Sequence, residues 1–144
     1  MRVLVDTCVW SLALRRRNKT SLSLEERRLT ARLTEAVQDG NVVMIGPIRQ
    51  EVLSGIKDEA QLIKTERLLD PFCDEPLGTA DYVEAARLFN LCRSHGVQCG
   101  PVDMLICSVA VRKRCFVLTS DQGLLSCLDV LRKNRLLPPA GSKA

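Results

Sequence analysis

The sequence predicts an α/β fold in which a mainly parallel sheet carries helices on both faces. Short apolar runs of strand length alternate along the chain with longer segments whose apolar residues recur at helical spacing. This alternation is typical of a parallel sheet that is covered on both faces. The 144 residues are enough for one domain with its own hydrophobic core. We place that domain at residues 1–137 and expect a loose polar tail at 138–144.

Strands are expected where short apolar runs occur. Residues 2–5, 42–45 and 115–119 have the length and composition of buried strands. Residues 71–77 are expected to form a short irregular strand, and residues 136–137 a last edge strand. The sheet should therefore contain four to five strands.

Helices are expected where apolar residues recur every three or four positions. They begin near Thr7, cover 22–38, open at Gly46-Pro47, cover 59–69 and 81–94, open at Gly100-Pro101 and cover 124–131. The residues of segment 81–94 that share a helical phase, and are expected on its buried face, are Tyr82, Ala86, Phe89 and Cys92. Thr20 and Ser21 are candidate caps for the second helix.

The composition indicates a cytoplasmic protein without a membrane span. No run of about 18 apolar residues occurs, and Asp6 interrupts the short apolar stretch at the start, so we expect neither a membrane helix nor a signal peptide. The net charge of +4 is compatible with a polyanionic partner. Aromatic residues make up only 3 % of the chain, which is little for a protein that stacks bases.

The seven cysteines and one histidine give little support for a zinc site. No Cys-x-x-Cys occurs, and His95 could join Cys92 or Cys99 only as an isolated pair. Most of the cysteines lie in apolar runs, where a free thiol behaves as a small hydrophobic group. This usage fits a reducing compartment.

Four acidic residues lie where open α/β sheets bind ligands. Asp6 directly follows the first strand, and Asp121 comes two residues after Thr119 at the end of another. Glu51 and Asp103 lie near the starts of helices that open with proline. The carboxyl ends of parallel strands and the N-termini of the following helices lie at the same rim. We therefore expect the four carboxylates to converge on one pocket.

Carboxylates gathered in one pocket favour a divalent cation, because it relieves their mutual repulsion. Mg²⁺ prefers hard oxygen ligands and keeps several waters. Such a site could polarise a phosphodiester and lower the pKa of a bound water. The chain offers no Ser/His/Asp set and no glycine-rich phosphate loop, so metal-assisted hydrolysis is the chemistry that the sequence favours.

Each acid also has a simpler structural explanation. Asp103 could interact with a helix dipole, Asp121 could cap the next helix, and Glu51 could face solvent. Asp6 is harder to explain without a function, since a strand end followed by Thr7 offers little reason for a charge. Taken singly, three of the four acids have a sufficient structural explanation, whereas their common placement favours the cluster.

Three basic runs are candidates for contacts with RNA phosphates. Arg15, Arg16 and Arg17 follow the helix after Asp6 and have the best claim. Residues 112–114 form a second run, whereas residues 132–133 are more typical of a solvated surface. We expect Trp10 to lie in the core or at a partner interface.

Four segments together resemble the acidic motifs of the VapC toxins, which are PIN-domain ribonucleases. They are VLVDTCVW, PIRQEVLSG, PVDMLICSVA and VLTSDQGL, in the same order and at similar spacing. The resemblance implies a three-layer α/β/α fold, Mg²⁺- or Mn²⁺-dependent cleavage of RNA, and homodimers inhibited by a VapB-like antitoxin. It implies catalytic roles for Asp6, Glu51, Asp103 and Asp121, with the metal on Asp6, Asp103 and Asp121 and with Thr119 in support.

Two positions depart from the family pattern. Cys8 stands where Asn or Ser is frequent, which removes a polar contact from the expected site. Gln122-Gly123 stands where a further acid and Phe often follow, so Asp121 is the only local acid and a second metal would be held less firmly.

Other functions remain open at this point. A PIN nuclease could process RNA without an antitoxin. A catalytically weak or inactive PIN-like domain could instead be an RNA- or protein-binding subunit, although the four retained acids argue against this. A phosphatase of the haloacid-dehalogenase type is disfavoured, because Cys8 stands where such an enzyme has its second Asp.

Overall fold

The computed structural model describes residues 1–15 and 21–141, in which strands and helices alternate as the sequence predicts. The elements in chain order are β1 (Val3–Val5), α1 (Thr7–Arg15), α2 (Leu24–Gln38), β2 (Val42–Val43), α3 (Gly46–Ser54), α4 (Glu59–Leu69), α5 (Thr79–Ser94), α6 (Pro101–Lys113), β3 (Phe116–Leu118) and α7 (Gln122–Lys133).

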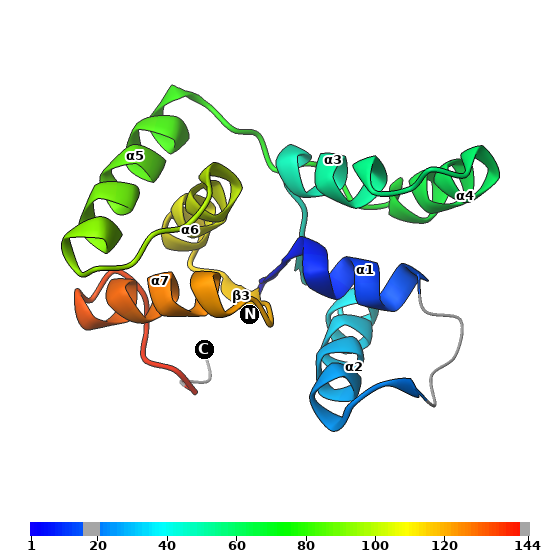
Figure 1. Cartoon of the computed structure of the whole chain (residues 1–144), viewed down its shortest axis with the longest axis horizontal. Coiled ribbons are helices and arrows are strands. Elements are labelled where there is room, and N and C mark those ends of the chain that lie inside the picture. Colours follow the sequence, from blue (N-terminus) through cyan, green and yellow to red (C-terminus); the bar gives the residue numbers. More distant parts are fainter. Residues whose placement is uncertain (16–20, 142–144) are drawn as a thin grey trace.

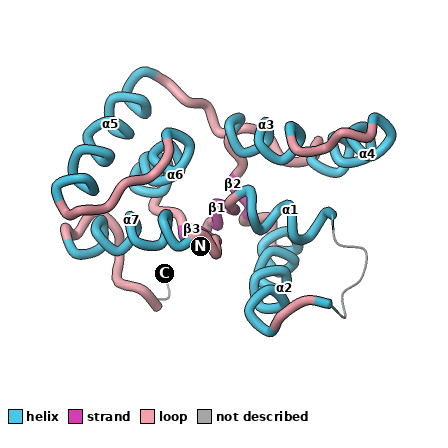
Figure 2. The backbone as a smooth tube through the Cα atoms, in the orientation of Figure 1, coloured by secondary structure: helices cyan, strands magenta, loops and turns pink. Residues whose placement is uncertain are grey.

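The sheet at the centre of the molecule is parallel and has the strand order β2-β1-β3 (Figure 2). Val3 in the central strand is paired with Val42 on one side and with Phe116 on the other. Because all the strands run in the same direction, their carboxyl ends meet at one edge. Asp6 follows β1 at this edge and Thr119 follows β3.

Within the described residues the sheet has three strands, fewer than the four to five expected. Segment 71–77 forms only one bridge, between Asp74 and Met44, with the Glu75 N–H bonded to the Met44 carbonyl at 2.8 Å. Pro71 and Pro76 bound this segment, and proline cannot donate to a ladder. The expected edge strand at 136–137 is also absent from the described residues, since these two residues form no ladder.

Helices gather on both sides of the sheet and give the α/β/α layering (Figure 1). One group contains α1 to α4 and the other contains α5 to α7. Helix α6 is the most enclosed, because every residue from 104 to 110 is buried. The helix is therefore not amphipathic over residues 104–110, which are buried on every side between α5, α7 and the sheet.

Helix α2 begins at Leu24, later than expected, because Ser23 caps it. The Ser23 hydroxyl accepts the Glu26 N–H at 3.1 Å, and the Glu26 carboxylate accepts the Ser23 N–H at 3.0 Å. This reciprocal pair satisfies two amides at the helix start. Of the two expected caps, Ser21 precedes the helix and Thr20 lies outside the described residues.

The buried face of α5 differs from the one expected. Tyr82 and Ala86 are exposed and Phe89 is half-buried. The residues that are buried are Asp81, Ala85, Leu88 and Cys92. Apolar spacing missed this face because it contains a charged residue, Asp81, whose partner Arg112 is 31 residues away in the sequence.

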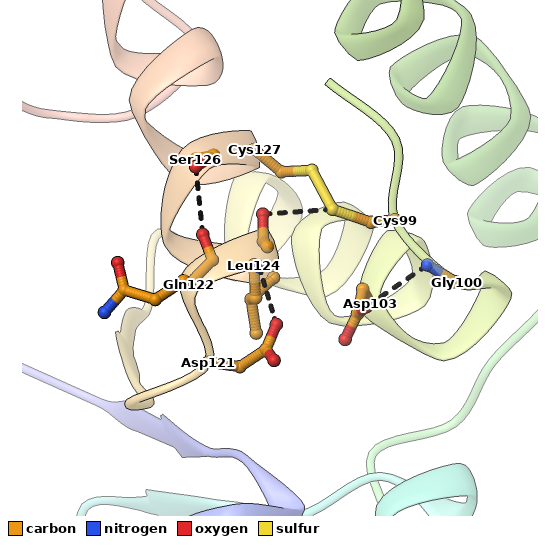
Figure 3. Close-up of a disulfide and its surroundings, with 9 residues drawn as sticks. Cys99, Gly100, Asp103, Asp121, Gln122, Leu124, Ser126 and Cys127 are labelled. Carbon is orange, nitrogen blue, oxygen red and sulfur yellow. Dashed lines mark hydrogen bonds between the residues drawn. A yellow bond between two sulfur atoms is a disulfide. The ribbon is translucent and has the colours of Figure 1, made fainter.

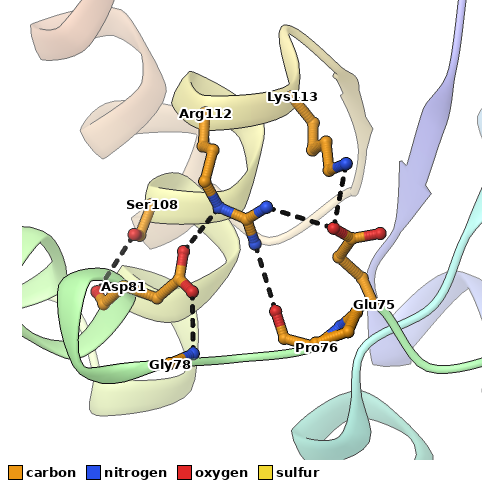
Figure 4. A network of polar contacts seen from close by, with 7 residues as sticks. All are labelled: Glu75, Pro76, Gly78, Asp81, Ser108, Arg112 and Lys113. Atoms are coloured by element: carbon orange, nitrogen blue, oxygen red, sulfur yellow. Dashed lines mark hydrogen bonds and ion pairs between the residues drawn. The ribbon is translucent and has the colours of Figure 1, made fainter.

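An ion-pair network around Arg112 fastens α5 to α6 (Figure 4). Arg112 Nε lies 2.7 Å from the buried Asp81 carboxylate, which also accepts the Gly78 N–H at 2.9 Å. Arg112 Nη1 and Lys113 Nζ both contact Glu75, at 3.1 and 3.0 Å. The Gly78 N–H and then Arg112 hold the pKa of Asp81 below its ordinary value. This acid is thus ionised and fully partnered inside the fold.

None of the described helices is long and apolar enough to cross a membrane.

Candidate active site

Asp6 is the most constrained acid of the site. It is only 6 % exposed and lies immediately after the central strand. Its Oδ1 accepts the Thr7 N–H at 2.8 Å. Its Oδ2 accepts the Thr119 hydroxyl at 2.7 Å and the Cys8 thiol at 3.5 Å. A carboxylate has about four lone-pair positions, so one position on Oδ1 stays available to a further partner.

Glu51 is joined to Asp6 through Thr7. Glu51 lies on α3, and its Oε1 accepts the Thr7 hydroxyl at 2.8 Å. Thr7 therefore uses its hydroxyl for one acid and its N–H for the other. This contact spans 44 residues of sequence and brings the first two acidic motifs together. Glu51 is exposed, unlike Asp6.

Asp103 and Asp121 each stabilise the start of a helix. The Oδ2 atom of Asp103 accepts the Gly100 N–H at 3.2 Å at the start of α6. The Oδ2 atom of Asp121 accepts the Leu124 N–H at 2.8 Å at the start of α7. The two helix starts lie beside each other (Figure 3). The structural explanations considered for these acids thus apply, but each engages only one carboxylate oxygen among the described residues.

Asp103 is repelled by the other three acids at this rim. The pKa of Asp103 is raised above its ordinary value, first by burial and then by the negative charges of Asp6, Asp121 and Glu51. The Gly100 N–H acts in the opposite direction but does not cancel these effects. The acids that the sequence singled out therefore lie within electrostatic reach of one another, at the carboxyl edge of the sheet.

The oxygen donors of the site suit a hard cation that binds through few carboxylates. In residues 1–15 and 21–141, no three His, Cys, Asp or Glu side chains are already placed to hold one metal ion. Mg²⁺ needs no such cage, because it usually binds through one or two carboxylates and keeps several waters. The free position on Asp6 and the second oxygens of Asp103 and Asp121 could supply that binding.

Sequence reasoning missed the side chains that hold the acids in place. The sequence predicts Thr7 only as a helix start, and it predicts that Cys8 removes a polar contact from the site. The second prediction is wrong, because the Cys8 thiol itself contacts Asp6. In the structure Thr7 bonds two acids, and Cys8 contacts Asp6, Thr119 and Ser120. The available signal was position, since both residues directly follow the strand-end acid.

A disulfide joins Cys99 to Cys127, a pairing that the sequence did not predict (Figure 3). Cys99 directly precedes the start of α6, and Cys127 lies on α7. The disulfide therefore ties together the two helices that begin near Asp103 and Asp121. A separation of 28 residues without a recognisable motif gave no signal for this pairing.

Three of the other cysteines match the expected hydrophobic role. Cys92, Cys107 and Cys115 are free and buried. Burial raises the pKa of each of these thiols above its ordinary value. They are therefore neutral packing groups at physiological pH.

The structure describes the side chains of the second basic run but not those of the first. The Arg15 side chain, Arg16 and Arg17 lie outside the described part of the chain, so the first run stays a prediction. Arg112 and Lys113 form the network with Glu75. The charges of Arg112 and Lys113 are thus directed to acids of the fold, whereas Arg114 is exposed and its contact with phosphates stays a prediction.

Trp10 is buried, with 3 % of its surface exposed. It packs edge-on against Phe72, with ring centroids 5.2 Å apart. Its expected place in the core is confirmed, and it is not a surface contact for a partner.

A family model described as PIN domain matches residues 3–127. The chain belongs to the PIN domain family. No curated protein matches the chain.

Two solved structures show the same fold. One is a crystal structure of FitAcB from Neisseria gonorrhoeae, with 22 % identity, a TM-score of 0.70 and coverage of 88 % of this chain and 93 % of that chain. The other is VapBC2 from Rickettsia felis bound to a DNA fragment from their promoter, with 14 % identity, a TM-score of 0.65 and coverage of 96 % and 94 %. At these identities the similarity concerns the fold.

Proposed function

We propose that this PIN domain is a cytoplasmic, Mg²⁺- or Mn²⁺-dependent endoribonuclease that acts as the toxin of a bacterial toxin–antitoxin pair. The observation that carries the proposal is that Thr7 and Thr119 join three acidic motifs by hydrogen bonds at the carboxyl edge of the sheet: Thr7 contacts Asp6 and Glu51, and Thr119 contacts Asp6 and the Asp121 N–H. The negative charges of the same three acids repel the carboxylate of Asp103. Unless a cation offsets it, such repulsion destabilises the fold without serving it. Membership of a family whose domains are generally nucleases supports the same conclusion.

The side chains of the site would have different roles. Asp6, Asp103 and Asp121 would hold the cation, and Thr119 would fix Asp6 through its 2.7 Å hydrogen bond. When bound, a divalent cation would supply activation of water and neutralisation of phosphate charge. Glu51 is exposed and accepts the Thr7 hydroxyl on Oε1, so its Oε2 would be the atom that accepts a proton from the attacking water.

Cleavage of RNA by charge-removing variants tests this proposal. Asp6→Asn and Asp103→Asn keep the side-chain shape but remove the charge, so each should lower Mg²⁺-dependent cleavage at least a hundredfold while the circular dichroism spectrum is retained. Asp129→Asn is the matched control, since Asp129 is an exposed acid of α7 that pairs only with Arg132 among the described residues. Full activity of either site variant would remove that residue from the catalytic set.

The proposed partners are a VapB-like antitoxin and a second copy of the chain. The similar structures FitAcB and VapBC2 are named for two-component assemblies, and the latter contains promoter DNA. Leu24 is 67 % exposed at the start of α2 and could contribute to such an interface. Light scattering of the purified chain at micromolar concentration should give the mass of a dimer, and a monomer would contradict this part of the proposal.

The alternative of an inactive binding subunit makes a different prediction. Wild-type protein would then bind RNA or an antitoxin without cleaving RNA at any Mg²⁺ or Mn²⁺ concentration. The cleavage assay therefore separates the two functions directly.

A further inference from the structure

The thiol of Cys8 lies inside the polar network of the acidic site. Its Sγ atom is 3.5 Å from Asp6 Oδ2 and 3.6 Å from Thr119 Oγ1. The Ser120 hydroxyl donates to the same sulfur at 3.5 Å. Cys8 is half-buried at the start of α1, so these contacts are made on the side of the helix that faces the end of β3.

The hydrogen positions follow from counting donors and acceptors. The Thr119 hydroxyl has one proton, which goes to Asp6 Oδ2 at 2.7 Å, while its oxygen accepts the Asp121 N–H at 3.0 Å. The Ser120 proton goes to Cys8 Sγ. The Cys8 thiol proton therefore remains for an acceptor, and the carboxylate is preferred over the neutral Thr119 oxygen because it is charged.

This assignment fills both acceptor positions of Asp6 Oδ2. Thr119 and Cys8 occupy that oxygen, whereas Oδ1 accepts only the Thr7 N–H within the described part of the chain. We propose that Cys8 is a positioning residue that holds Asp6 so that Oδ1 alone is presented to a divalent cation. The inference rests on the proposed function, since it assumes that Asp6 binds the metal. A serine at this position would supply a comparable donor, whereas alanine would leave Oδ2 with the Thr119 hydroxyl alone and one acceptor position open toward the cation.

Metal binding by the full chain tests this role without reference to RNA cleavage. Mn²⁺ affinity, measured by calorimetry, should fall about tenfold in Cys8→Ala, the lower end of the effect expected for a group that orients a ligand. Cys8→Ser should bind Mn²⁺ as the wild type does. Cys73→Ala is the matched control, because Cys73 is a free, exposed cysteine of the loop after α4. Cys8→Val, which also lacks a donor, replaces Cys8→Ala if the alanine variant loses the wild-type circular dichroism spectrum.

Cleavage gives a second readout. In Cys8→Ala the Mg²⁺ concentration for half-maximal cleavage should rise about tenfold, while the rate at saturating Mg²⁺ returns toward that of the wild type. Equal Mn²⁺ affinity in the wild type and the alanine or valine variant would overturn the role of Cys8 and leave the proposed nuclease function intact. A wild type that binds no Mn²⁺ would overturn both.

Discussion

Thr119 Oγ1 donates a 2.7 Å hydrogen bond to Asp6 Oδ2 although 113 residues separate the two in the chain. The same oxygen accepts the Asp121 N–H at 3.0 Å. One hydroxyl at the end of β3 therefore sets the orientation of the central acid and the position of the last acidic motif.

Replacing Thr119 with valine should weaken both the fold and metal binding. Valine has nearly the same shape but leaves the Asp121 N–H without its acceptor and Asp6 Oδ2 with one donor fewer. We expect a loss of about 1–3 kcal/mol in the free energy of unfolding, measured in urea. Mn²⁺ affinity should fall about tenfold. Thr119→Ser keeps the hydroxyl and should retain most of the stability and of the Mn²⁺ affinity. If Thr119→Val equals Thr119→Ser in these two quantities, the hydroxyl is dispensable.

Asp103→Asn should raise the melting temperature of the metal-free protein by a few degrees. The amide oxygen can still accept the Gly100 N–H, whereas the repulsion from Asp6, Asp121 and Glu51 disappears. Since the pKa of Asp103 is raised in the fold, the wild type regains this stability as the pH falls and the carboxyl group takes up a proton.

The difference in melting temperature between the two proteins should therefore shrink in EDTA as the pH is lowered from neutral through the raised pKa of Asp103. Saturating Mg²⁺ should reverse their order, because only the charged form binds the cation. A constant difference across this pH range, with or without Mg²⁺, would mean that the acids do not interact as described.

Arg112→Met should destabilise the protein by about 2–4 kcal/mol, because it leaves the buried Asp81 carboxylate without its charge partner. The matched control is Arg132→Met, which breaks a pair with an exposed acid of α7 and should cost under about 1 kcal/mol. The pKa values of Asp81 and Glu75 are lowered in the fold, so their stabilisation is present above their ordinary values. It is lost as the pH falls through the folded values, and the wild type and Arg112→Met should converge in acid. A gap that persists there would point to packing and not to charge.

Removing the disulfide should cost about 3–4 kcal/mol under non-reducing conditions, the chain-entropy value for a closed loop of this length. Cys99→Ser should show this loss in a denaturant titration. In excess dithiothreitol the wild type and the variant should have the same midpoint. A difference that survives reduction would mean that Cys99 acts through a contact of its own, such as the one its sulfur makes with the Gly123 carbonyl.

The proposed antitoxin should inhibit by placing an arginine against the four acids at the carboxyl edge of the sheet. Asp6, Glu51, Asp103 and Asp121 form a negative rim, and a guanidinium group can engage carboxylates through two hydrogen bonds. Such a contact competes with Mg²⁺, so more antitoxin should be needed for half-inhibition at high Mg²⁺ than at low Mg²⁺. An inhibition curve that does not move, with the antitoxin's arginines replaceable by alanine, would indicate that the antitoxin blocks the RNA path instead.

The features that the sequence predicted well are those governed by local rules. Asp6 was identified because a charge directly after an apolar strand has few structural reasons. The helices that begin at Gly46 and at Pro101 were placed by their prolines. The parallel sheet was predicted from the alternation of strands and helices, each of which is recognised from its own short segment.

The features that could not be predicted depend on partners far away in the chain. Asp81 lies on a buried face because Arg112 neutralises its charge. The spacing of hydrophobic residues gives no information about such an ion pair. The link between Cys99 and Cys127 has no local pattern either. The Thr7 hydroxyl could be assigned to Glu51 only once α3 had been placed beside α1.

The acidic rim has a mechanical consequence because it straddles the two groups of helices. Glu51 belongs to the group α1 to α4, whereas Asp103 and Asp121 begin helices of the group α5 to α7. Asp6 stands between them at the end of the central strand. A cation bound across this rim would link the two groups of helices that the sheet separates. Amide hydrogen exchange near the starts of α3, α6 and α7 should therefore slow together when metal is added.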